Sequence, residues 1–297
     1  MTMGEFYSAS DTQEACALLS RYGEKASVLA GGTDLMVAVN QRRTPLETVI
    51  FIGRTGLGYI ECEQDALRIG ATTTHTEIAR SPIVREKAPL LAEAVRSIGS
   101  PAIRNMGTIG GNVANASPGA DGSVSLLALG ARVKLASVRG ERIVDLESFF
   151  VDRGRTLLEP DELLTEVIIP VQGKANRWTW RKLGQRKASV CAVISLAMAL
   201  ELEGGTCRRV RIALGTVAPT PFLARKAGER LEGGPLTPAL IENAAKAASE
   251  SLPDRDGLRA SAWYRRRICE VLIKEFCSNL LNHPSFPRRR ESSGSTW

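Results

Sequence analysis

The chain has 297 residues, of which 43% are hydrophobic and 24% charged, as in ordinary soluble globular proteins of two or three domains. No apolar run approaches the roughly 20 residues of a membrane span, and the N-terminus lacks the features of a signal peptide, so we predict a cytoplasmic protein without a membrane span. The net charge of +7 raises nucleic acid as a partner, but aromatic residues make up only 5% and do not interleave with basic stretches. We therefore expect no nucleic-acid binding, and assign the charge to an anionic cofactor and an acidic partner surface.

The first part of the chain predicts short strands and helices in alternation. A helix is expected to begin after the capping residue Asp11 and to end at Gly23. Apolar spacing and proline positions predict the remaining elements: strands at 28–30, 49–52 and 67–71, helices at 76–80 and 81–98 with a break or kink at Pro89, and strands at 133–136, 142–145 and 163–169.

A change of pattern near residue 175 predicts a domain boundary, with the polar segment 172–177 as linker. The later part predicts antiparallel strands followed by helices: strands at 190–202 and 210–217, and helices at 222–231, 237–251 and 261–281. From His283 onward the composition predicts a disordered tail without function.

The six cysteines form no C-x-x-C pair, and the closest two, Cys269 and Cys277, are eight positions apart. Metal and iron–sulfur sites usually show tighter clustering. We predict free, mostly buried thiols and neither a metal nor an iron–sulfur cluster on this chain.

Two glycine-rich motifs are the most informative features: residues 30–35 (AGGTDL) and 107–112 (GTIGGN). Glycine allows positive φ and lets backbone N–H groups approach an anion. One such turn is most often structural, but two, each after an apolar run, favour a cofactor with a pyrophosphate. The chain lacks both G-x-G-x-x-G and G-x-x-x-x-G-K-[ST], so a Rossmann or P-loop site is disfavoured.

Five ordered motifs carry a family resemblance. They are 30–35, 103–112 (IRNMGTIGGN), 116–121 (ASPGAD), 162–167 (ELLTEV) and 181–186 (RKLGQR). In order and spacing, over roughly residues 3–280, the chain resembles the FAD-binding medium subunit of the molybdenum hydroxylases, the family of xanthine dehydrogenase and aerobic carbon monoxide dehydrogenase.

The resemblance implies an α+β fold. It consists of a two-lobed FAD-binding domain of the vanillyl-alcohol oxidase (PCMH) type and a C-terminal domain with an antiparallel sheet and helices. The implied boundaries are 1–56 for the first lobe, 57–175 for the second, 176–282 for the C-terminal domain and 283–297 for the tail.

The resemblance also implies which residues hold FAD. The backbone of 31–34 and 107–112 would bind the pyrophosphate, Ser117 and Asp121 the ribityl or ribose hydroxyls, and Lys182 would lie near the edge of the cofactor. Ile98 and Leu164 would pack on the isoalloxazine. The full implied set is Leu29, Ala30, Gly31, Gly32, Thr33, Asp34, Leu35, Ile98, Gly107, Thr108, Gly110, Gly111, Asn112, Asn115, Ser117, Ala120, Asp121, Leu164 and Lys182, with no catalytic and no metal-binding residue.

Each of these side chains also has a purely structural interpretation. Asp121 could cap a helix at 123–129, Leu164 is typical of a core strand, and Lys182 could be a solvated charge. His75 lies in a threonine-rich stretch, and we expect a hydrogen-bonded loop histidine without a catalytic role.

Two departures from relatives on the same scaffold are informative. Flavoproteins that attach FAD covalently use a histidine in the first glycine loop, where this chain has Thr33, so we expect non-covalent FAD. The cysteine-rich insertion of 4-hydroxybenzoyl-CoA reductase is missing, which disfavours that member.

The resemblance implies an electron relay. Electrons from a molybdopterin centre on a large subunit would pass through [2Fe-2S] clusters on a small subunit to this FAD, and then to NAD, a quinone or O2. A dimer of heterotrimers is the expected assembly. Two alternatives remain: a self-contained flavin reductase on the same scaffold, like the enolpyruvyl-UDP-N-acetylglucosamine reductase of wall synthesis, and a basic binding protein with no redox role.

Overall fold

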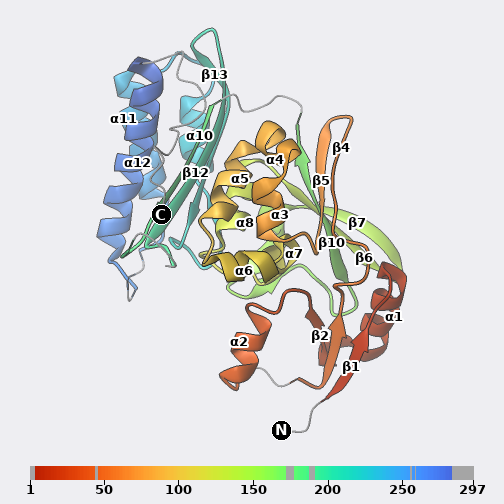
Figure 1. The fold of residues 1–297 in the computed structure, drawn as a ribbon. Coiled ribbons are helices and arrows are strands. Elements are labelled where there is room, and N and C mark those ends of the chain that lie inside the picture. The colour runs from red at the N-terminus through yellow and green to blue at the C-terminus, as the bar shows by residue number, and fades with distance from the viewer. Residues whose placement is uncertain are drawn as a thin grey trace, which may run out of the picture.

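The computed structural model describes residues 4–43, 46–171, 177–186, 191–254, 256–257 and 259–282. Figure 1 shows the chain passing through three regions in sequence order: a small N-terminal sheet, a central sheet covered by helices, and a C-terminal sheet with its own helices. The predicted linker at 172–177 and the predicted tail lie almost wholly outside the described residues. No helix in the described ranges is both long and apolar enough to cross a bilayer.

The N-terminal region is a parallel sheet in the order β1-β3-β2, formed by β1 (Glu5–Ser8), β2 (Ala26–Leu29) and β3 (Thr48–Phe51). Helix α1 (Thr12–Tyr22) begins and ends as predicted. The Asp11 side chain accepts a hydrogen bond from the Glu14 N–H at 2.8 Å, and Gly23 follows the helix with φ of 52°. The short helix α2 (Leu35–Asn40) was not predicted; it buries no residue and lacks a side-chain cap, so it leaves little pattern in the sequence.

The central region is a five-stranded antiparallel sheet in the order β4-β5-β10-β6-β7. Its strands are β4 (Ile60–Glu63), β5 (Ala66–Gly70), β6 (Arg132–Ser137), β7 (Gly140–Asp145) and β10 (Leu163–Pro170). Its helices are α3 (His75–Arg80), α4 (Pro82–Lys87), α5 (Pro89–Arg96), α6 (Pro101–Met106), α7 (Ile109–Ala114) and α8 (Asp121–Ala128). Small elements α9 (Leu146–Phe149), β8 (Phe150–Asp152) and β9 (Arg155–Thr156) connect β7 to β10.

The predicted helix at 81–98 is two helices. Ala88 leaves helical geometry with φ −138° and ψ 58°, and Pro89 is the first residue of α5. Proline disfavours helical backbone in the residue before it and cannot continue the hydrogen-bond ladder, so the break at Pro89 is complete.

The C-terminal region is an antiparallel sheet in the order β11-β12-β13-β14 with three helices. The elements are β11 (Arg177–Leu183), β12 (Ile194–Glu203), β13 (Thr206–Gly215), β14 (Phe222–Leu223), α10 (Arg225–Leu231), α11 (Pro238–Glu250) and α12 (Ala262–Asn282). The predicted helix at 222–231 is wrong in its first residues, because Phe222 and Leu223 pair with β13.

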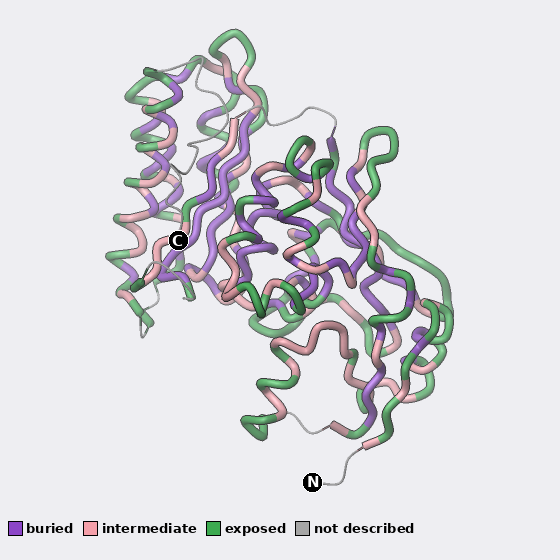
Figure 2. The backbone as a smooth tube through the Cα atoms, viewed as in Figure 1, coloured by how far each residue is buried: buried purple, intermediate pink, exposed green. Residues whose placement is uncertain are grey.

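Both faces of this sheet are buried (Figure 2), which explains the long apolar run that the sequence shows there. Ala197 and Ala199 of β12 belong to the core shared with the central helices, whereas Leu196 and Met198 belong to the core under the C-terminal helices. Alanine on one face lets α8 approach the sheet closely. The sheet thus packs against both sets of helices, and its strand β11 contacts α5 of the central region.

The six cysteines all lie in described parts of the chain, and all are free thiols. Cys16, Cys207, Cys269 and Cys277 are buried, as the prediction of mostly buried thiols requires, while Cys62 and Cys191 are exposed.

Candidate functional site

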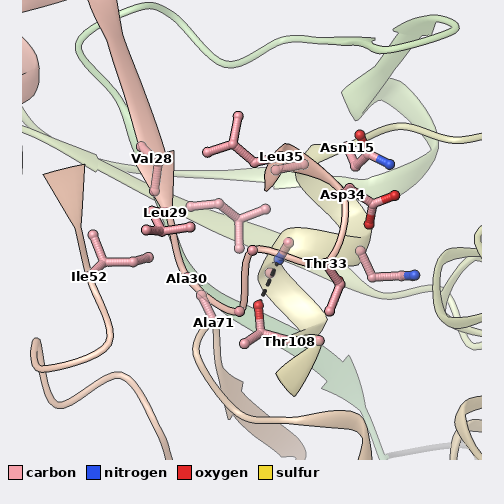
Figure 3. A pocket seen from close by; sticks show the side chains of 18 of the residues that line it. Val28, Leu29, Ala30, Thr33, Asp34, Leu35, Ile52, Ala71, Thr108 and Asn115 are labelled. Carbon is pink, nitrogen blue, oxygen red and sulfur yellow. Dashed lines mark hydrogen bonds between the residues drawn. The ribbon is translucent and has the colours of Figure 1, made fainter. Parts of the chain in front are cut away.

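A cavity of about 360 Å³ lies between the N-terminal and central regions, where the two glycine motifs meet. Every residue of the predicted site lines this cavity except Ser117, Ala120, Asp121 and Lys182. Figure 3 shows apolar side chains of Val28, Leu29 and Ile52 in one part of it and the polar side chains of Asp34 and Asn115 in another. The cavity therefore offers both an apolar and a polar surface to one ligand.

The two glycine motifs touch at Gly31. A Cβ at this position would lie 1.8 Å from the carbonyl oxygen of Met106 and 3.1 Å from the Gly107 nitrogen. No side chain can occupy that space, so glycine is required for the two motifs to meet. The next residue, Gly32, has φ of +70°, a second reason for glycine in this turn.

The first motif presents unused backbone donors at the cavity wall. Within the described chain, the N–H groups of residues 31–34 donate no hydrogen bond to another protein atom. Residues 31–33 are half-buried and Asp34 is exposed, and all four line the cavity, so their unpaired N–H groups are available to a ligand that accepts hydrogen bonds. Such a run of backbone donors can serve as a cradle for an anion.

The second motif differs from the prediction, because it begins a helix and its backbone donors are occupied. Thr108 caps α7, and its Oγ1 accepts the Gly111 N–H at 3.1 Å, the bond dashed in Figure 3. Four other N–H groups of this motif donate to backbone carbonyl oxygens: Gly107 donates to Ile103, Ile109 to Thr73, Gly110 to Ala71 and Asn112 to Thr108. In this motif only the Thr108 N–H is left for a ligand.

Gly110 is required for packing: a Cβ there would lie 2.6 Å from the Ala71 Cβ. Asn112 accepts the Ser123 N–H on its Oδ1 at 3.0 Å, which leaves its amide nitrogen as a donor. The second motif therefore contributes shape and side-chain donors more than backbone N–H groups.

Asp121 and Lys182 form a buried ion pair outside the cavity. Lys182 Nζ donates to Asp121 Oδ2 at 2.5 Å and to the Ser97 carbonyl at 2.9 Å, next to the cavity residue Ile98. Asp121 is the first residue of α8 and its side chain makes no capping hydrogen bond, so its interpretation as a helix cap is wrong. The Lys182 side chain is 12% exposed, so its interpretation as a solvated charge is wrong as well. Burial raises the pKa of Asp121 to about 6, against the lowering effect of Lys182.

His75 is a cavity residue that the sequence prediction missed. It is the first residue of α3 and 3% exposed, and its Nδ1 has no hydrogen-bond partner among the described residues, so the expected hydrogen-bonded loop histidine is wrong. Burial, assisted by the charge of Arg104, lowers its pKa to about 4. His75 reaches the cavity because Thr74 bridges to Thr108 across 34 positions of chain, a contact without a local sequence signal.

Several further lining residues were not predicted: Val28, Ala38, Ile52, Ala71, Ile103, Ala114, Leu158, Glu162 and Leu163. Among these, Glu162 is held by two hydrogen bonds from Arg142, at 2.6 and 2.7 Å, and this contact lowers its pKa. Leu164 is both a core residue, 4% exposed, and part of the cavity wall, so its two interpretations are compatible.

Comparison with known proteins agrees with this geometry. Residues 2–172 match the family model described as the FAD binding domain in molybdopterin dehydrogenase, and residues 180–280 match the CO dehydrogenase flavoprotein C-terminal domain. The nicotinate dehydrogenase FAD-subunit of Eubacterium barkeri is 34% identical over 284 residues, covering 94% of this chain and 96% of the relative. The carbon monoxide dehydrogenase medium chain of Hydrogenophaga pseudoflava is 34% identical over 271 residues, covering 91% and 94%.

Solved structures show the same fold. Carbon monoxide dehydrogenase from Hydrogenophaga pseudoflava matches with a TM-score of 0.88 and 34% identity, covering 93% of this chain and 96% of that chain. Quinoline 2-oxidoreductase from Pseudomonas putida 86 matches with a TM-score of 0.88 and 26% identity, covering 96% and 100%.

The cavity between two glycine motifs and the two matched domains define an FAD-binding oxidoreductase subunit with an α+β fold. The chain belongs to the family of FAD-binding medium subunits of the molybdenum hydroxylases.

Proposed function

We propose that this chain binds FAD non-covalently in the cavity and relays electrons within a molybdenum hydroxylase complex. Electrons would arrive from [2Fe-2S] clusters on a small partner subunit and leave to NAD, a quinone or O2. The complex would hydroxylate a purine, an aldehyde, CO or an N-heterocycle at a molybdopterin centre on a large subunit. FAD, when bound, supplies the redox chemistry, and the protein supplies position and electrostatics.

The observation that carries the proposal is the run of free N–H groups at 31–34 in a cavity of this family. A pyrophosphate has oxygen acceptors for several converging donors, and no lysine is needed for such a cradle. Thr33 and Thr108 would add hydroxyl donors from the two motifs. The residues present therefore fit a dinucleotide flavin.

Three further predicted residues, Ile98, Leu164 and Asp121, support the proposal through their surroundings. Ile98 and Leu164 present apolar side chains to the cavity, where a flavin ring would pack. Within the described chain, Asp121 Oδ1 has no hydrogen-bond partner, and we assign it to a ribityl or ribose hydroxyl at the edge of the site. Ser117 and Lys182 would lie beside it, outside the cavity wall.

Partner subunits are part of the proposal because the relatives are named as subunits and medium chains. We propose a large molybdopterin-binding subunit and a small [2Fe-2S] subunit, in a dimer of heterotrimers. The alternative function is a self-contained flavin reductase, which would need no partner and would turn over with NAD(P)H alone.

Affinity purification of this chain from its native host, with an absorbance spectrum and metal analysis, separates these functions. We expect two co-purified subunits together with flavin, iron and molybdenum. Flavin without partners, with NAD(P)H-driven turnover, would contradict the relay and support the self-contained reductase.

The flavin is expected to dissociate when the protein is denatured, because the first glycine motif has Thr33 where a covalent linkage would need histidine. Acid precipitation of FAD-loaded protein should leave the flavin absorbance in the supernatant. Flavin that remains on the precipitated chain would contradict non-covalent binding. The Thr33→His variant, treated identically, is the matched comparison.

A further inference from the structure

The cavity is poor in positive charge. Among the described residues that line it, none is lysine or arginine, and the carboxylates are Asp34 and Glu162. Glu162 is paired with Arg142, whereas Asp34 has no ion pair in the described chain. A doubly charged pyrophosphate would therefore meet backbone dipoles and hydroxyls, with no permanent cation on the wall. Among the described lining residues, only His75 has a side chain that can become positive.

His75 lies directly behind the point where the two glycine motifs meet. Its Cδ2 and Nε2 are 3.2 and 3.4 Å from the position of a Cβ on Gly107. Gly107 in turn borders Gly31, the first residue with a free N–H in the cradle. The backbone N–H of His75 donates to the Gly107 carbonyl at 3.0 Å, which ties the start of α3 to this loop.

Without a bound anion, burial and the positive charge of Arg104 keep the His75 imidazole neutral. Charged residues on α3 and on the helices packed against it are Glu77, Arg80, Arg85, Glu86, Lys87, Glu93, Arg96 and Arg104. Of these, only Arg104 acts on His75, and a positive neighbour opposes protonation. Glu77 is turned away, since its carboxylate accepts from the Thr74 N–H in a capping box. Arg104 itself donates to the Ile98 carbonyl at 2.7 Å.

We propose that His75 takes up a proton from solvent when the pyrophosphate of FAD binds, and so becomes the cation of the cradle. This inference rests on the proposed function. An anion at the Gly31–Gly107 junction stabilises the imidazolium and offsets both desolvation and the repulsion from Arg104. By linkage, a group whose pKa rises on binding makes binding tighter at lower pH. His75 is a binding residue in this account, and it takes no part in electron transfer.

Imidazole NMR tests the proposal on the full chain, because the sequence contains only two histidines, His75 and His283. The ¹⁵N chemical shifts of the ring distinguish neutral from protonated imidazole, and His283→Gln assigns the signals. At pH 6.5 we expect neutral His75 without FAD and protonated His75 with FAD. Neutral His75 with FAD bound would overturn the proposal and leave the FAD assignment intact. If no FAD binds, the proposed function fails, and this inference with it.

The pH dependence of FAD affinity gives an independent readout. Between pH 5 and 6.5 the dissociation constant should rise with pH by up to about tenfold per unit, because this window lies above the pKa of His75 in the free chain, about 4, and below its pKa in the complex; above the pKa in the complex the dependence should disappear. His75→Asn should remove this dependence. Asp34→Asn is the matched control, since burial also raises the pKa of Asp34, and this variant should keep the dependence. A slope retained in His75→Asn and lost in Asp34→Asn would assign the proton to Asp34 and overturn the proposal.

Discussion

The Gly31→Ala variant is expected to lose FAD. Its Cβ would lie 1.8 Å from the Met106 carbonyl oxygen; the backbone fixes the Cβ position and the oxygen is a backbone atom, so neither can rotate away. The two glycine motifs must separate, which misplaces the free N–H groups of 31–34. We expect affinity for FAD to fall by at least roughly 100-fold, or about 2.7 kcal/mol, with a loss of stability of about 1–3 kcal/mol from the overlap.

Fluorescence titration with FAD and thermal unfolding measure the two effects. Gly234→Ala is the matched control, because a Cβ at Gly234 meets no atom within 4 Å and that glycine lies in the C-terminal region. Its affinity and stability should equal those of the unaltered chain. FAD affinity within twofold of wild type in Gly31→Ala would contradict the placement of the cradle.

Lys182→Met is expected to destabilise the folded chain strongly. The Asp121 side chain is 4% exposed, and its charge is compensated by Lys182 alone among the described residues. Removing one partner of a buried ion pair leaves an uncompensated charge and typically costs about 3–5 kcal/mol. In a chain of this size the midpoint of thermal unfolding should fall by roughly 10 °C at pH 8.

The double variant Lys182→Met with Asp121→Asn separates the ion pair from simple packing. Replacing both charges removes the uncompensated carboxylate, so most of the lost stability should return. Lowering the pH towards about 6 should also narrow the difference in stability between Lys182→Met and wild type, because without Lys182 the pKa of Asp121 rises above its value of about 6 and the carboxyl of the variant takes up a proton first. Equal destabilisation by the single and double variants at all pH values would show that Lys182 acts through packing alone.

Much of the fold follows from local pattern. The cap Asp11, the stop at Gly23 and the apolar spacing locate α1, and β3, β5, β6, β7 and β10 fall where the strands were predicted. Where prediction failed, the deciding contacts are distant in sequence. Phe222 and Leu223 form a strand because they pair with β13. Helix α2 has no buried face, so its sequence shows no hydrophobic periodicity.

The candidate site, like the fold, was predicted where the signal is local and missed where it depends on contacts distant in sequence. The two glycine motifs predict the part of the cavity wall that residues 30–35 and 107–112 form, because a glycine-rich turn can be recognised in the sequence. His75, Ile52 and Glu162 reach the cavity only through tertiary contacts, such as the bridge of Thr74 to Thr108. The sequence did not predict the role of the second motif. Its residue Gly110 allows close packing against Ala71, and its backbone N–H groups, apart from that of Thr108, already donate to other atoms of the described chain.

A structure of the full chain determined with FAD tests the central claim most directly. We expect the pyrophosphate to accept hydrogen bonds from the N–H groups of 31–34 and from Thr108, with the flavin ring beside Ile98 and Leu164. FAD bound elsewhere on the chain, or a pyrophosphate that makes no contact with 31–34, would contradict this account.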